Sequence, residues 1–209
     1  MLAIVPVNSP SSGKQRLRSL LSAPLRAELV QAMLADVLDA CKQARSVDRI
    51  VVVTPERALA PDDVEVLTDA GRGHAAAIAA ALAWSGNEDA LVVMADCPLV
   101  RPGTIDLLFD CARPVALAPA QDGGTNALVL RPADAIEPAF GVRRGAAVLA
   151  KRAERLGVEL AIVHDPLLAL DVDRPEDVER VLDLGQGTRT HALLSRELDA
   201  SAEFRRKSA

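Results

Sequence analysis

A basic loop near the start of the chain has the residue types needed to bind several phosphate groups. Lys14 and Arg16 follow the apolar run at residues 2–7, and no acidic residue precedes Glu28. The loop does not match a P-loop, because Asn8 stands where the first glycine of that motif is required. Two interpretations stay open: Lys14 and Arg16 bind one polyphosphate, or they belong to a solvated loop.

Three aspartates have the positions expected of ligands for a divalent cation. Asp96 follows the most hydrophobic run of the chain, at residues 90–95, where a buried strand would end. Asp171 and Asp173 are alternate residues of an extended segment, so both carboxylates would face the same side. Carboxylate oxygens suit a hard cation such as Mg²⁺. The alternatives are a turn cap for Asp96 and a helix cap for Asp173.

A glycine-rich turn brings polar side chains to the start of another apolar run. Residues 122–128 read Asp-Gly-Gly-Thr-Asn-Ala-Leu, and the two glycines let the backbone approach a ligand. A hairpin turn would explain Asp-Gly-Gly, but it would not require Thr125 and Asn126 directly before the apolar residues. We therefore expect Thr125 and Asn126 at a binding site.

A second pair of glycines leads into an alanine-rich segment. Gly71 and Gly73 precede His74, which begins a predicted helix at residues 74–84. The amino terminus of such a helix can contact a nucleotide, and His74 would then lie beside it. A histidine that caps the helix or lies on the surface remains an equal alternative.

These residues require a sheet that brings strand ends to one edge. Strand-like runs alternate with segments of helical periodicity along most of the chain. Strands are predicted at 2–7, 49–54, 64–67, 90–95, 115–118, 126–130 and 159–163, and helices at 24–44, 74–84, 104–111, 145–156 and 176–184. The alternation predicts an α/β protein, a Rossmann-like three-layer sandwich with a mixed, mostly parallel sheet. We expect one domain at residues 1–184 and a peripheral tail at 185–209.

Composition excludes several classes of function. The net charge is −5 and aromatic residues make up 2% of the 209 residues, which argues against binding a nucleic acid polymer. The longest apolar runs have about ten residues, half of what a membrane span requires. Three cysteines without a CxxC pair indicate neither a disulfide framework nor a zinc site. These features favour a cytoplasmic protein that does not enter a membrane.

The order of the motifs resembles the phospholactate guanylyltransferase family of coenzyme F420 biosynthesis, over residues 2–184. That family belongs to the nucleotidyltransferases with a glycosyltransferase-A-like α/β fold. The motifs that carry the resemblance are Lys-x-Arg-Leu at 14–17, Asp-x-Pro-Leu at 96–99, Gly-Gly-Thr-Asn-Ala-Leu at 123–128, Phe140-Gly141, and Leu-Asp-Val-Asp-x-Pro-Glu-Asp at 170–177.

The resemblance implies a reaction and a role for each motif. A small phosphorylated carboxylic acid (2-phospholactate, phosphoenolpyruvate or 3-phosphoglycerate) would attack the α-phosphate of GTP and release pyrophosphate. The implied roles are catalysis by Lys14, Arg16, Asp96 and Asp173; nucleotide binding by Lys14, Arg16, Gly71, Gly73 and His74; acceptor binding by Thr125, Asn126, Gly141 and Arg144; and Mg²⁺ binding by Asp96, Asp171 and Asp173.

The chain also departs from the family pattern. Asn8 stands where a lysine is usual, Arg144 where a serine follows Phe-Gly, and Ala147 where a histidine is usual. These changes affect the parts of the expected site that would bind the acceptor and recognise the nucleotide base, and they leave the three aspartates in place. Two alternatives stay open: a nucleotidyltransferase of the molybdenum-cofactor type, and a nucleotide-binding protein with a decayed acceptor site. A homodimer is an open expectation.

Overall fold

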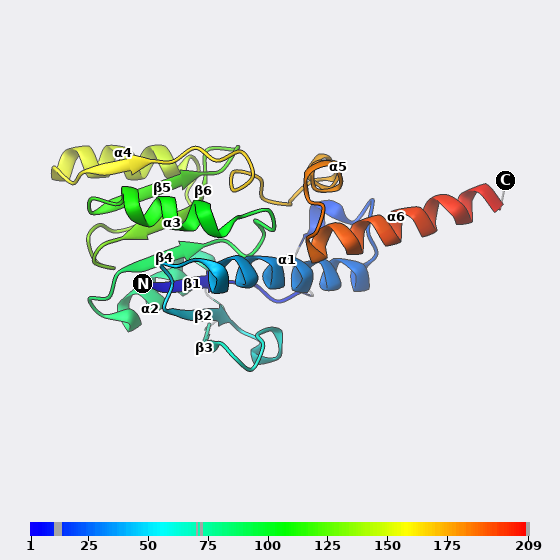
Figure 1. Cartoon of the computed structure of the whole chain (residues 1–209), viewed down its shortest axis with the longest axis horizontal. Helices are drawn as coiled ribbons and strands as arrows, with labels where there is room; N and C mark the ends of the chain where they lie inside the picture. Colours follow the sequence, from blue (N-terminus) through cyan, green and yellow to red (C-terminus); the bar gives the residue numbers. More distant parts are fainter. Residues whose placement is uncertain (11–13, 70, 72, 208–209) are drawn as a thin grey trace.

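The apolar runs of the sequence become the strands of one sheet in the computed structural model, which describes residues 1–10, 14–69, 71 and 73–207 (Figure 1). Within that range seven strands are arranged in the order β3-β2-β1-β4-β6-β5-β7. Strand β6 is antiparallel to β4 and β5, and the other neighbours are parallel. The strands are β1 (Leu2–Pro6), β2 (Arg49–Thr54), β3 (Glu65–Thr68), β4 (Ala90–Val93), β5 (Val115–Pro119), β6 (Thr125–Leu130) and β7 (Leu160–Ile162).

Helices cover both faces of the sheet, because alternate strand residues point to opposite sides. Ala3 and Val5 of β1 pack in one apolar cluster with α1, α3, α5 and α6, whereas Leu2 and Ile4 pack in a second cluster with α2 and α4. The predicted three-layer α/β sandwich with a mixed, mostly parallel sheet is confirmed. The helices are α1 (Ala23–Gln43), α2 (His74–Ser85), α3 (Pro102–Cys111), α4 (Gly145–Leu156), α5 (Pro175–Leu184) and α6 (Arg189–Lys207).

The strand order creates a switch point between β1 and β4. From β1 the chain continues to β2 on one side, while β4 lies on the other side and leads to β5 and β6. Connections that leave two neighbouring strands in opposite directions open a crevice at their carboxyl ends, where α/β proteins bind ligands. The amino end of the antiparallel β6 reaches the same edge.

The segment at residues 163–174, between β7 and α5, runs back across this edge and is held there by hydrogen bonds. The backbone N–H of Val172 donates to the carbonyl of Asp96 at 3.0 Å, and Gln121 N–H donates to Ala169 O at 3.2 Å. The connection places Asp171 and Asp173 beside the end of β4, although they belong to an irregular segment and not to a strand.

The start of α5 leaves the carboxylate of Asp173 available to other partners. Asp173 was considered as the cap of this helix, but the carboxylate of Asp177 accepts from the N–H groups of Asp173 at 3.0 Å and Arg174 at 2.8 Å. The backbone of Asp173 is therefore satisfied by Asp177, and its own side chain turns toward the cleft.

The segment expected as a peripheral tail, 185–209, contains α6, which begins against α1. The carboxylate of Asp36 in α1 accepts from the N–H groups of Arg189 at 2.8 Å and Thr190 at 2.9 Å, and Leu194 is fully buried. Figure 1 shows the second half of α6 extending beyond the other elements. Among the residues that the structure describes, no helix combines the length and apolar character of a membrane span.

Candidate active site

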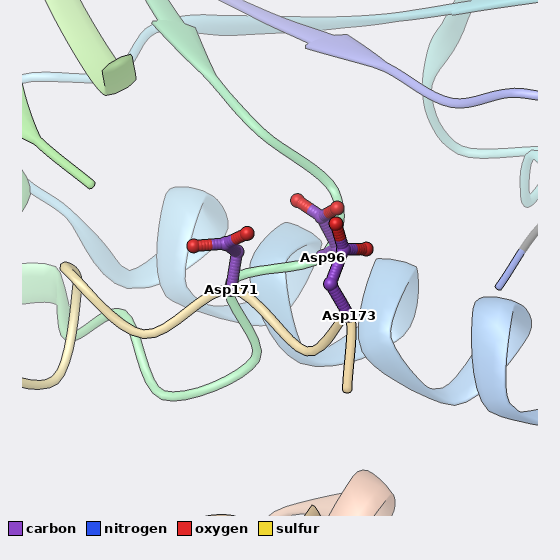
Figure 2. A group of neighbouring side chains, drawn as sticks. All are labelled: Asp96, Asp171 and Asp173. Atoms are coloured by element: carbon purple, nitrogen blue, oxygen red, sulfur yellow. The ribbon is translucent and has the colours of Figure 1, made fainter. Parts of the chain in front are cut away.

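Three carboxylates from two distant parts of the chain meet at the carboxyl end of β4. One oxygen each from Asp96, Asp171 and Asp173 lies within 4.8 Å of the other two. Figure 2 shows Asp171 and Asp173 projecting from the same side of their segment toward Asp96, as their alternate spacing predicts. Three oxygen ligands that converge at the edge of a cleft fit a hard divalent cation. The structure thus brings together the three predicted metal ligands.

Lys14 reaches into this carboxylate cluster from the start of a short 3-10 helix, Gln15–Leu17, that lies between β1 and α1. Its ammonium Nζ lies 2.7 Å from Asp96 Oδ2 and 2.8 Å from Asp173 Oδ1, and its side chain is only 9% exposed. The backbone of Lys14 is left-handed, with φ 54°, which is uncommon for a residue other than glycine. Two ion pairs and burial hold it there. Arg16 lies 3.4 Å from Asp173 but is 68% exposed, so solvent screens that pair.

The pKa values of the cluster follow from burial and mutual charge. Burial alone would lower the pKa of Lys14, but the charges of Asp96 and Asp173 raise it above its ordinary value. Burial would raise the pKa of Asp96, but Lys14 holds it below its ordinary value. Burial and then the charge of Asp96 raise the pKa of Asp171 to about 6. At pH 7 and above the carboxylates of Asp96 and Asp171 are therefore ionised, beside a charged lysine.

The carboxylates form one wall of a cleft of about 530 Å³. Its walls come from the ends of β1 and β4, the start of β6, the start of α2, and the loop at residues 139–143. The polar side chains on these walls are Asn8, Lys14, His74, Asp96, Asp122, Thr125, Asn126, Arg143, Asp171 and Asp173. A cleft of this size can enclose a nucleotide and a small second substrate.

Two glycines position the loop that closes one side of the cleft. A Cβ on Gly145 would lie 2.4 Å from the carbonyl oxygen of Ala139, so only glycine permits this close approach at the start of α4. Gly141 has φ 71° and packs near Ala75 at the start of α2. The loop is thereby fixed between the first turns of α4 and α2, with Gly141 on the cleft wall.

Thr125 and Asn126 both line the cleft, but their surroundings differ. Asn126 is 4% exposed, and its amide Nδ2 donates to the carbonyl of Leu168 at 2.9 Å and to Asp171 Oδ1 at 3.4 Å. These bonds hold the returning segment and orient Asp171. Thr125 is half-buried at the start of β6, on the cleft wall.

His74 begins α2 and faces the cleft. Its Nε2 atom is buried and has no hydrogen-bond partner in the described part of the chain, and burial lowers the pKa of the imidazole. The ring is therefore neutral at pH 7. A buried polar atom without a partner costs about 1–3 kcal/mol, so a ligand group that bonds to Nε2 would be favoured.

Four of the predicted binding residues do not line the cleft: Arg16, Gly71, Gly73 and Arg144. Gly71 and Gly73 have φ values of 72° and 88° and shape the entry into α2, where Gly73 is the N-cap. Residues 70 and 72 beside them, like 11–13 of the basic loop, lie outside the described residues. Arg144 is the exposed N-cap of α4, also left-handed with φ 55°, and lies beside Gly123.

Two charged residues on the cleft wall were not singled out by type and spacing. Asp122 was interpreted only as part of a turn, and its Oδ1 does accept from Gly124 N–H at 2.8 Å. Arg143 adjoins the predicted Arg144, and of the two only Arg143 lines the cleft. The family pattern indicates Arg144, whereas the cleft wall contains Arg143.

The fold is the α/β fold of nucleotidyltransferase-like structures. A solved structure from Desulfovibrio desulfuricans G20 superposes with a TM-score of 0.78 at 19% identity and covers 95% of both chains. A nucleotidyl transferase from Methanothermobacter thermautotroptrophicus superposes with a TM-score of 0.62 at 20% identity, covering 87% of this chain and 95% of its own. At these identities the likeness shows the fold.

The sequence narrows this class to one family. The chain belongs to the family described as guanylyl transferase CofC like, whose model matches residues 1–209. It is 37% identical to a phosphoenolpyruvate guanylyltransferase of Sphaerobacter thermophilus (86% of this chain, 91% of the relative) and 39% to a 2-phospho-L-lactate guanylyltransferase of Halorubrum lacusprofundi (87% and 84%). It is 36% identical to a 3-phospho-D-glycerate guanylyltransferase of Phenylobacterium zucineum (92% and 94%).

Proposed function

We propose that this protein transfers GMP from GTP to a small phosphorylated carboxylic acid, with Mg²⁺ bound by its three aspartates. The observation that carries the proposal is the convergence of Asp96, Asp171, Asp173 and Lys14 at the switch point of the sheet. Family membership supports the reaction, since relatives with this activity span most of the chain.

The chemistry needs charge neutralisation and positioning more than proton transfer. A phosphate oxygen of the acid bonds to the α-phosphorus of GTP, the bond from that phosphorus to the β-phosphate oxygen breaks, and pyrophosphate leaves. The attacking oxygen is already ionised, so no general base is required. Mg²⁺, when bound, supplies positive charge beside the reacting phosphates. Lys14, whose ammonium is buried beside Asp96, adds a second positive charge for the triphosphate.

The remaining residues of the cleft bind and orient the substrates in this proposal. His74 offers its unpaired Nε2 to the nucleotide. Thr125 and Gly141 lie at the acceptor side, while Asn126 orients Asp171. The candidate acceptors are 2-phospholactate, phosphoenolpyruvate and 3-phosphoglycerate, since relatives named for each of them are 36–39% identical to this chain.

Replacing Asp96 tests the proposed metal site. Asp96→Asn keeps the shape of the side chain but removes a charge, so pyrophosphate release from GTP and a phospho-acid should fall by roughly 100-fold or more. Asp63→Asn, which alters a surface pair with Lys42, is the matched control and should keep its activity. Circular dichroism checks that both variants fold. Unchanged turnover in Asp96→Asn would remove Asp96 from the active site.

A further inference from the structure

The cleft carries more negative than positive charge on its walls, although its proposed substrates are anions. Four aspartates line it: Asp96, Asp122, Asp171 and Asp173. Against them, the described lining residues include two permanently charged cations, of which Lys14 is already paired with two carboxylates. Arg143 is the other cation. A phosphorylated carboxylic acid carries negative charge at both ends, so its far end needs a partner besides the metal and Lys14.

Arg143 is available to be that partner. Its side chain is exposed and forms no hydrogen bond or ion pair within the described part of the chain. The loop that carries it is held in place at both ends, by the close approach of Gly145 to Ala139 and by the packing of Gly141 near Ala75. The backbone position of Arg143 is therefore fixed, while its guanidinium is free to meet a ligand.

The loop also adjoins the acceptor side of the cleft. The N–H of Ala146 in the first turn of α4 donates to the carbonyl of Gly123 at 3.2 Å, which joins the loop to the glycine-rich turn before β6. Thr125 Oγ1 lies 3.7 Å from the position that a Cβ on Gly145 would take. Arg143 thus belongs to the wall formed by this turn, across the sheet edge from β1, and Lys14 lies on the far side at the start of the short 3-10 helix Gln15–Leu17.

We propose that Arg143 binds the carboxylate of the acceptor and so selects phosphorylated acids over phosphate esters that lack a carboxylate. The inference rests on the proposed function. The phosphate of the acceptor must meet the α-phosphate of GTP near the aspartate cluster, which directs the other anionic group toward the opposite wall. A guanidinium matches a carboxylate with two parallel hydrogen bonds, whereas a lysine provides only a point charge. Arg144 is not suited, because it is the exposed N-cap of α4 outside the cleft.

The kinetic test compares Arg143→Gln with Arg155→Gln, a control on the exposed far end of α4. The acceptors are 3-phosphoglycerate, phosphoenolpyruvate and 2-phospholactate, and the matched ester is glycerol 3-phosphate, in which a hydroxymethyl group replaces the carboxylate. In Arg143→Gln, the KM of the preferred acid should rise roughly 10- to 100-fold, with the KM of GTP unchanged. The preference for the acid over the ester should shrink by a similar factor. Arg155→Gln should match the wild type.

Direct binding gives a second readout that does not depend on turnover. Calorimetry measures the affinity of the protein for each of the three acids, in the presence of Mg²⁺ and a non-reactive GTP analogue. Weaker binding to Arg143→Gln, partly restored in Arg143→Lys, supports the assignment. An unchanged affinity in Arg143→Gln, a loss confined to Arg144→Gln, or no binding of any acid to the wild type overturns it. Binding of an acid to the wild type without turnover overturns the proposed function alone.

Discussion

At the scale of single residues, the site is organised around a buried ion pair network. Lys14 lies between Asp96 and Asp173, at 2.7 and 2.8 Å, in the space to which a divalent cation would also be drawn. Two cations cannot both occupy the centre of the cluster without strong repulsion. We therefore expect a metal bound by these carboxylates to compete with the ammonium of Lys14, to which the phosphates of a nucleotide offer another partner.

Removing the charge of Lys14 should strengthen metal binding in the absence of nucleotide. For Lys14→Met we expect roughly tenfold tighter binding of Mn²⁺, because the competing ammonium is gone. We also expect GTP to raise the Mn²⁺ affinity of the variant less than it raises that of the wild type. Electron paramagnetic resonance titration at pH 8, above the pKa of about 6 of Asp171, measures both affinities. Lys42→Met, at a surface pair with Asp63, is the control. Equal or weaker Mn²⁺ binding by Lys14→Met would contradict this account.

Residue type and spacing predicted the charged centre of the site better than its periphery. Asp96, Asp171 and Asp173 could be found because strand ends meet at one edge of an α/β sheet. That Arg143 lines the cleft and Arg144 does not could not be predicted, since it depends on how the loop packs between the starts of α2 and α4. Nor could sequence show that the amide of Asn126 is engaged by the carbonyl of Leu168, 42 positions away.

At the scale of elements, the segment that delivers Asp171 and Asp173 depends on an anchor at Asp165. Its carboxylate accepts from the hydroxyl of Thr104 in α3 and from the N–H groups of Leu167 at 2.8 Å and Leu168 at 3.1 Å. Burial would raise the pKa of Asp165, but these hydrogen bonds hold it below its ordinary value. The ionised form is therefore the one that stabilises the fold.

Asp165→Ala should destabilise the protein in a manner that depends on pH. The loss of three hydrogen bonds should lower the free energy of unfolding by about 2 kcal/mol at pH 7. The pKa of Asp165 is lower in the folded protein than in the unfolded chain, where it is about 4. The ionised carboxylate therefore adds its full share to the free energy of unfolding above a pH of about 4, and this share disappears as pH falls through the folded pKa. Urea unfolding at pH 7 and at acid pH measures the difference between variant and wild type. Asp134→Ala, at an exposed position, is the control; a difference that grew as pH fell would contradict the assignment.

Local signals predicted most elements but could not predict one of them. Residues 49–54 and 145–156 form a strand and a helix with the expected bounds, since hydrophobic periodicity and flanking residues are local properties. Helix α6, at Arg189–Lys207, was not predicted. Its first N–H groups bond partly to Asp36 of α1, 153 positions distant in sequence, and the local signal is limited to Thr188, whose hydroxyl accepts from His191 N–H at 3.0 Å.

At the scale of the whole molecule, the sheet order brings the separate motifs together. The alternation of strands and helices predicted a mixed, mostly parallel sheet, but it did not reveal that β6 lies between β4 and β5. That placement sets the glycine-rich turn and Thr125 opposite the end of β1. The site depends on this non-local arrangement, in which residues after β1, after β4 and before α5 line one cleft.

The measurement that tests guanylyl transfer most directly combines each nucleotide with each acceptor. Wild-type protein is incubated with Mg²⁺, one of GTP, ATP or CTP, and one of 2-phospholactate, phosphoenolpyruvate or 3-phosphoglycerate, and ³¹P NMR follows the products. We expect GTP with at least one acid to give pyrophosphate and a new diphosphate linkage between GMP and the acid in equal amounts. The absence of that product from every combination, or its formation at the same rate by Asp96→Asn, would contradict the account.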